Sequence, residues 1–275
     1  MFMQFDCGRR SPAVLLLAVL ALGGAVVRLQ AQTNAAASQD AQAKAPAYDV
    51  VSVKPHQPGD GSMSWGPTRD GYIAKNVMVV LLIRDAYNLT KLDQILGLPG
   101  WAMDARFDLQ AKMDEDTASA LARLPHDQQW QQRQLMLQAA LADRFKLKVH
   151  RESRMLPVYA LVVAKGGSKL KPSHGGEGWW SWSGPAINVH AEPASMLAMC
   201  LSKLPEIDRT VVDRTGLAGD YDVDLKWTPE DEQAQPDAPP TVFTAIEEQL
   251  GLKLVPSKGP VDVILVDHVE RPSPN

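Results

Sequence analysis

Two groups of side chains in this sequence are of types that could carry chemistry. The first is a set of tryptophans among glycines, with Trp179, Trp180 and Trp182 in one glycine-rich stretch and Trp65 in another. Aromatic rings on a loop can stack on sugars, peptides or prolines at a low entropic cost. These four residues therefore predict a contact surface for a ligand or a partner. The alternative is that their rings fold down and cap the sheet.

The second group is an acidic run in which Asp220, Asp222 and Asp224 alternate with apolar residues. On a strand this spacing places all three carboxylates on one face. Such carboxylates could bind calcium or act as a general acid and base, which makes them a candidate hydrolytic site. The alternative interpretation is a solvated strand face whose apolar neighbours point inward.

Other motifs predict neither a metal nor a cofactor, and no catalytic residue is assigned. The six histidines are scattered, no His-Glu-x-x-His occurs, and no glycine-rich phosphate or dinucleotide motif is present. Ser168 and Lys171 have the spacing of a serine activated by lysine, but glycines and a proline around them predict a loop. Cys200 lies in an apolar run and is predicted to be a buried small hydrophobe.

The elements that must position these residues follow from apolar periodicity. The predicted helices are 77–87 with Asn76 as N-cap, 127–145, 194–204, and 242–250 with Thr241 as cap. The predicted strands are 48–54, 94–96, 106–113, 146–151, 158–164, 210–213, 221–227, 252–255 and 261–266, with a hairpin turn at 257–260. The tryptophan-containing stretches 58–67 and 175–185 are predicted loops, as is 228–240.

The order of these elements indicates an internal duplication. Residues 71–82, 97–109 and 145–163 have counterparts, in the same order, at 186–197, 216–223 and 251–266. We therefore expect an α+β fold that repeats helix–strand–strand units, with helices packed on a mainly antiparallel sheet. The two halves are predicted to be 47–172 and 173–272.

The N-terminus is typical of an exported protein. Residues 1–31 have paired arginines, an apolar core and a small residue at the cleavage position, which predicts a signal peptide. The alternative is an uncleaved anchor, but the apolar run is shorter than the roughly 20 residues that span a bilayer. Residues 32–46 are predicted to be a flexible leader. We expect a periplasmic or secreted protein without a membrane span after cleavage.

Several of these blocks resemble one family. They are 48–55, 98–101, 141–152, 156–167, 212–217 and 250–254. The resemblance is to a large paralogous family of uncharacterised exported proteins of soil acidobacteria. A related domain follows the membrane metallopeptidase domain of β-lactam-sensor-like proteins, which implies an extracytoplasmic sensing or binding role. Residues 241–254 are also similar to the short N-terminal domains of secretins and TonB-dependent receptors, which bind partner proteins.

The leading functional hypothesis is a non-catalytic binding or sensing module for a protein, a peptide or a cell-envelope polymer. The runner-up is an extracytoplasmic hydrolase that uses the acidic run, and a structural envelope component is a third possibility. The net charge of −4 gives no electrostatic case for nucleic acid. The oligomeric state is left open.

Overall fold

The computed structural model describes residues 47–57, 59, 61–229 and 240–272. Within them the chain forms a mixed α+β fold with three four-stranded, mostly antiparallel sheets, which confirms the predicted fold class. The internal duplication stays a prediction. The predicted signal peptide and leader lie outside the described residues.

Six helices lie in the described residues. They are α2 (Val79–Ala86), α3 (Trp101–Asp104), α4 (Glu115–Ala122), α5 (His126–Arg144), α6 (Ala194–Lys203) and α7 (Val242–Leu250), with a 3-10 turn η1 (Leu92–Gln94). The two C-terminal helices lie where apolar spacing predicts them. In α6, for example, the buried face includes Leu197, Leu201 and the sulfur of Cys200.

Each sheet has four strands. The first has the order β1 (Val50–Pro55), β5 (Arg106–Lys112), β3 (Gly71–Met78) and β2 (Ser64–Thr68). The second has the order β10 (Val211–Asp213), β6 (Lys148–Val163), β12 (Leu252–His268) and β4 (Ile95–Leu96). The third has the order β7 (Lys171–Pro172), β11 (Asp220–Lys226), β9 (Ala186–Pro193) and β8 (Trp179–Trp182).

Two large hydrophobic cores hold these elements together. The first packs β1, β3 and β5 against α2 and the C-terminal part of α5, and it also contains Ile264 and Val266 of β12. The second packs β9 and β11 against α6 and α7, and it contains Leu252 and Leu254 of the same strand. β12 therefore contributes to both cores.

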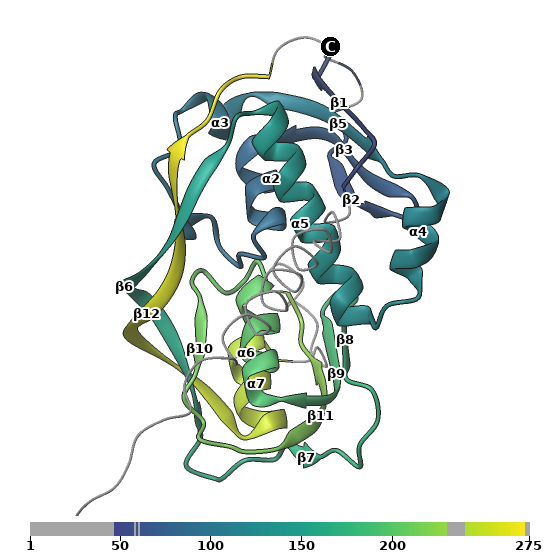
Figure 1. The fold of residues 1–275 in the computed structure, drawn as a ribbon. Helices are drawn as coiled ribbons and strands as arrows, with labels where there is room; N and C mark the ends of the chain where they lie inside the picture. Colours follow the sequence, from purple (N-terminus) through teal and green to yellow (C-terminus); the bar gives the residue numbers. More distant parts are fainter. Residues whose placement is uncertain (1–46, 58, 60, 230–239, 273–275) are drawn as a thin grey trace, which may run out of the picture. The chain divides into compact units, whose positions relative to one another are not determined.

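β6 and β12 form a long antiparallel ribbon (Figure 1), from the pair Lys148–His268 to the pair Val163–Leu252. The sequence predicts two strands in place of each, with a turn at 257–260, and this is wrong. The amide of Ala164 donates to the carbonyl of Gly251, which fixes the hydrogen-bonding phase of the ribbon. Pro157 and Pro256 then fall at non-hydrogen-bonded pairs, where a proline sacrifices no ladder bond.

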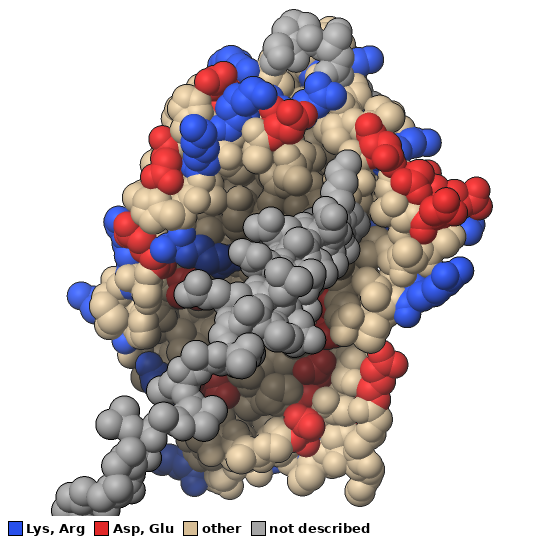
Figure 2. All heavy atoms as spheres, viewed as in Figure 1, with Lys and Arg blue, Asp and Glu red and all other residues tan. Residues whose placement is uncertain are grey.

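The acidic segment before α5 forms a short helix of its own, α4. Asp114 is the N-cap of α4, and its carboxylate accepts hydrogen bonds from the amide and hydroxyl of Thr117. Glu115 and Asp116 occupy the first turn, where negative charge is favourable. On the face seen in Figure 2, acidic side chains gather over α4.

Candidate functional site

The tryptophans that were predicted to lie on loops lie in strands. Trp179, Trp180 and Trp182 belong to β8, which pairs with β9, and Trp65 belongs to β2, which pairs with β3. The prediction fails because the glycines that flank these residues suggest loops, whereas tryptophan itself favours strands. A strand sends alternate rings to opposite faces, so the four residues cannot form one loop surface.

Two of the tryptophans face inward. Trp65 packs against the first core and Trp180 against the second. A cation also lies over each ring, with the Arg84 guanidinium carbon 5.8 Å from the Trp65 centroid and the Lys203 ammonium 5.2 Å from that of Trp180. These rings are thus held by contacts within the chain.

The other two tryptophans are open to solvent. Trp179 is 50% exposed and Trp182 is 46% exposed, although both are large apolar residues. Trp179 lies opposite His190 of β9, and the two ring centroids are 5.7 Å apart at 33°. The exposed indoles are therefore the part of the predicted aromatic surface that a ligand can reach.

His190 joins the aromatic candidate to the acidic one. Its Nδ1 lies 2.8 Å from Oδ1 of Asp222 on β11. The three aspartates differ in their contacts. Asp224 pairs with the Lys226 ammonium at 3.2 Å. Asp220 lies near Glu192, whose pKa is raised mainly by its own burial and secondly by the charge of Asp220. Of the three aspartates, Asp222 is the one that the structure joins to the tryptophan surface, through its contact with His190.

Asp222 also holds a bulge in β9. Ala191 has φ 50°, in the left-handed region that non-glycine residues avoid, and the pairing register with β11 shifts there. Its amide, which would otherwise lack a ladder partner, donates to Asp222 Oδ1 at 3.0 Å. This hydrogen bond is the main reason that the pKa of Asp222 lies below its ordinary value.

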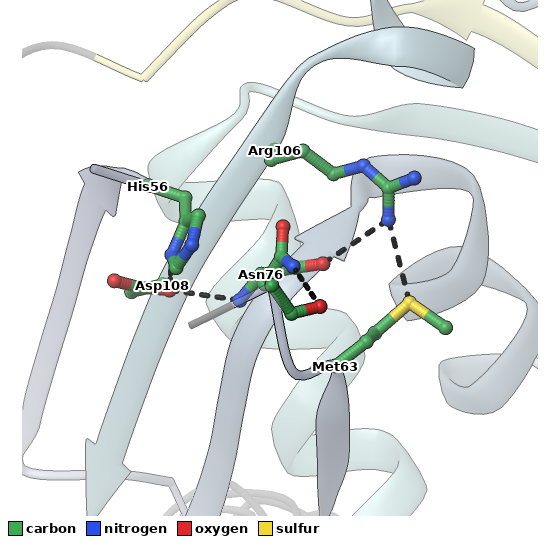
Figure 3. A network of polar contacts seen from close by, with 6 residues as sticks. His56, Met63, Asn76, Arg106 and Asp108 are labelled. Atoms are coloured by element: carbon green, nitrogen blue, oxygen red, sulfur yellow. Dashed lines mark hydrogen bonds and ion pairs between the residues drawn. The ribbon is translucent and has the colours of Figure 1, made fainter. Parts of the chain in front are cut away.

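The first half contains the same arrangement (Figure 3). Asn76 has φ 58° at a bulge in β3, and its amide donates to Asp108 Oδ1 at 2.8 Å. His56 Nδ1 lies 2.8 Å from the same oxygen, and the guanidinium of Arg106 donates to the Asn76 carbonyl. Asn76 therefore holds a bulge and is not the predicted helix cap, because α2 begins after Met78.

The two halves thus share a carboxylate that accepts one bulge amide and contacts one imidazole. In the first half the imidazole comes from the segment after β1, and in the second it comes from β9 itself. Since the common element is the amide of a left-handed residue, stabilising the bulge is the role that both carboxylates share. Only in the second half does the imidazole also contact an exposed tryptophan that lies on a strand edge.

We expect the Asp222 carboxyl to titrate below its ordinary value of 3.8. Because the folded pKa is lowered, this group contributes stability above its unfolded pKa, and the contribution is lost as pH falls through the folded pKa. The midpoint can be measured by NMR from the side-chain carboxyl carbon. His190→Ala retains the Ala191 amide and should keep most of the depression. A midpoint at or above 3.8 in the parent would contradict the assigned hydrogen bond.

Comparison with protein families identifies the wider group. The family model described as "Protein of unknown function (DUF3738)" matches residues 80–269. The chain belongs to the DUF3738 family. Comparisons with curated proteins and with solved structures found no match. The matched span of this DUF3738 protein includes β8, His190 and Asp222, whereas His56, Trp65 and Asn76 precede it.

The remaining sequence candidates of the DUF3738 chain do not assemble a reactive site. Cys200 is buried, and burial raises the pKa of its thiol to about 12. The Ser168 hydroxyl accepts from the Leu170 amide in an irregular segment, so the helical serine–lysine arrangement is absent there. In the described part of the chain, no group of three or more His, Cys, Asp or Glu side chains could hold a metal ion.

Sequence reasoning missed a partly buried polar pair in the DUF3738 fold. The Tyr72 hydroxyl donates to Asp85 at 2.6 Å, and burial is the main cause of its raised pKa. The pair lines a small recess with Arg133 of α5, whose guanidinium donates to carbonyls of the β2–β3 turn. Tyr72 and Asp85 lie on a strand and a helix, so no periodic pattern could relate them.

Among the described residues no helix is long and apolar enough to cross a membrane.

Proposed function

We propose that the protein is an exported, non-catalytic binding module that engages a protein, peptide or cell-envelope ligand through Trp179 and Trp182. The observation that supports this proposal is that two half-exposed indoles lie on one four-residue edge strand. Large exposed apolar side chains can mark interaction sites, and by strand alternation these two flank the edge on opposite faces of the strand. Indoles also contribute a large contact area while losing little side-chain entropy.

The surroundings of Trp179 suit a ligand with polar groups as well as an apolar one. His190 lies beside the ring and is oriented by Asp222, which places an imidazole nitrogen and a carboxylate next to the exposed indole. Binding sites commonly combine an aromatic surface with a few placed polar groups that fix orientation. This combination favours specific recognition over simple capping of the sheet.

One observation favours the alternative of a hydrolase. An imidazole held by a carboxylate is the arrangement of a general base. The first half, however, has the same pair of His56 and Asp108 at its own bulge, without an exposed tryptophan opposite the histidine. The repeated use of the pair to hold a strand bulge supports a structural role for it, and hence supports the binding function.

The proposal includes export. We propose that residues 1–31 are a cleaved signal peptide, that the mature protein is periplasmic or secreted, and that the chain is one of the acidobacterial paralogues that it resembles. The likeness of 241–254 to partner-binding domains of secretins and TonB-dependent receptors supports a protein partner. N-terminal sequencing of the exported protein should find Gln32 as its first residue.

We expect the double variant Trp179→Ala, Trp182→Ala to lose its ligand. A partner would be captured from envelope extract by the mature parent, identified, purified and titrated against both proteins. Removing the two exposed indoles that flank this edge strand should weaken binding tenfold or more, about the effect of a hot-spot residue. Trp65→Ala is the matched control, since it removes an indole that faces the first core. Equal affinity of parent and double variant would show that this surface is wrong.

A further inference from the structure

β8 offers a row of unpaired main-chain groups at the edge of the third sheet. It pairs on one side with β9, and no described strand pairs with its other side. The Ser183 amide donates to the Ala186 carbonyl, so this pair is hydrogen-bonded. Because such pairs alternate along antiparallel strands, Trp180 and Trp182 direct their amides and carbonyls away from β9. These groups can receive another strand.

The other described edge strands are protected and β8 is not. Natural proteins block exposed edges with short strands, lysine, proline or bulges, because an open edge invites pairing with another chain. The protected edges are β4 and β10, which have two and three residues, β1 and β7, which both end in Lys-Pro, and β2, which contains Gly66-Pro67. β8 reads Trp-Trp-Ser-Trp, with neither a charge nor a proline. Its exposed indoles would also strengthen an added strand through cross-strand contacts.

Charge selects the kind of chain that fits this edge. The stretch from Pro172 to Ser202, which contains β8 and β9, has no lysine or arginine, and Glu177 lies just before β8. Glu192 on β9 and Asp222 on β11, the next strand beyond β9, add two carboxylates. The Lys203 ammonium lies over the inward-facing Trp180 ring, whereas the Asp222 carboxylate lies beside His190 and hence near Trp179. A basic segment is attracted to these carboxylates, whereas a second copy of β8 would bring two sets of them together.

We propose that β8 binds an extended, basic segment of a partner polypeptide by strand addition. This inference rests on the proposed binding function and specifies its mode and partner. The added strand would hydrogen-bond to the outward groups of Trp180 and Trp182. One face of it would place lysine or arginine against the Trp179 indole, as a cation–π contact, and the other would place apolar side chains beside Trp182.

The test uses an alternating Lys-Val peptide of about eight residues, within the usual strand length, and two substitutions at one position. Trp182→Ala removes the indole but keeps the outward amide, whereas Trp182→Pro removes both. Since a proline cannot donate, Trp182→Pro loses the main-chain hydrogen bond from residue 182 to the peptide and disturbs the strand pairing next to it. We therefore expect Trp182→Pro to bind the peptide about tenfold more weakly than Trp182→Ala. Equal unfolding temperatures of the two variants establish that both are folded.

A second arm leaves the protein unaltered, which covers the case of a proline variant that does not fold. Two peptides are compared, one N-methylated at its odd-numbered residues and one at its even-numbered residues. Only one of these two sets of amides faces β8, so one peptide should lose binding and the other should keep it. A Glu-Val peptide should bind at least tenfold more weakly than the Lys-Val peptide.

Equal affinity of both methylated phases would overturn strand addition. Equal affinity of the Lys-Val and Glu-Val peptides would overturn the basic partner. Self-association of the parent that Trp182→Pro abolishes would make a second copy the occupant and overturn the proposal. If no peptide binds but the envelope partner still depends on Trp179 and Trp182, strand addition fails while the proposed binding function stands.

Discussion

Phe145→Ala should lower the free energy of unfolding by about 3–5 kcal/mol, the usual cost of truncating a buried phenylalanine. The Phe145 side chain is fully buried, and its ring packs edge-on against Phe107 with centroids 5.5 Å apart. Phe107 in turn makes an edge-on contact with Trp101. The substitution would leave a cavity beside the Phe107 ring, which is held in β5 and by its contact with Trp101 and so cannot collapse into it.

Urea denaturation measures this change. Phe243→Ala is the matched control, because Phe243 is 37% exposed and makes its edge-on contact, with Tyr159, at the surface. We expect the control to cost about 1 kcal/mol, in line with one aromatic pair. A loss below 1 kcal/mol for Phe145→Ala would mean that Phe145 does not occupy the first core.

Gly251→Ala should have the second large effect. Gly251 ends α7 with φ 64°, in the left-handed conformation, and an added Cβ would lie 2.1 Å from the carbonyl oxygen of Gly167. The conformation costs about 1–2 kcal/mol for a residue with a Cβ. Displacing the Gly167 backbone adds about 1–3 kcal/mol, as for other overpacked sites.

Gly219→Ala separates the two contributions. Gly219 also has a positive φ, of 96°, but an added Cβ would meet nothing within 4 Å. This variant should therefore show the conformational cost without the steric one. If denaturation curves show equal losses for Gly251→Ala and Gly219→Ala, the close approach of Gly167 to α7 is wrong.

The parts of the fold that the sequence predicts are those set by local spacing. α7 spans 242–250 as predicted, and β5 spans Arg106–Lys112 where alternation predicts a strand to 113. Both patterns lie within one element, so no knowledge of the partner is needed. The glycines and prolines near β2 and β8, and in the middle of β6 and β12, predict loops or turns where the structure has strands. A proline destabilises a strand only where its missing amide would have faced a paired neighbour, and the sequence does not show which side is paired.

The candidate site was predictable only as separate pieces. Trp179 and Asp222 stand out by residue type, but His190 reads as an isolated histidine. The contact of His190 with Asp222 depends on the bulge at Ala191, which shifts the register of β9 against β11. A register shift follows from long-range pairing and leaves no periodic trace in the sequence. Which strands lie at the edges of the sheets, and hence that β8 is an unprotected edge, follows from the strand order and not from the sequence.

The ribbon of β6 and β12 has a consequence for the order in which the chain can fold. Ribosomes deliver the N-terminal residues first, yet Ile264 and Val266, from the last strand, belong to the core built mainly on 53–149. That core stays incomplete until the end of the chain has been synthesised, and its closure requires contacts between distant residues, which slows folding. A nascent chain that still lacks residues 264–266 therefore cannot complete its first core.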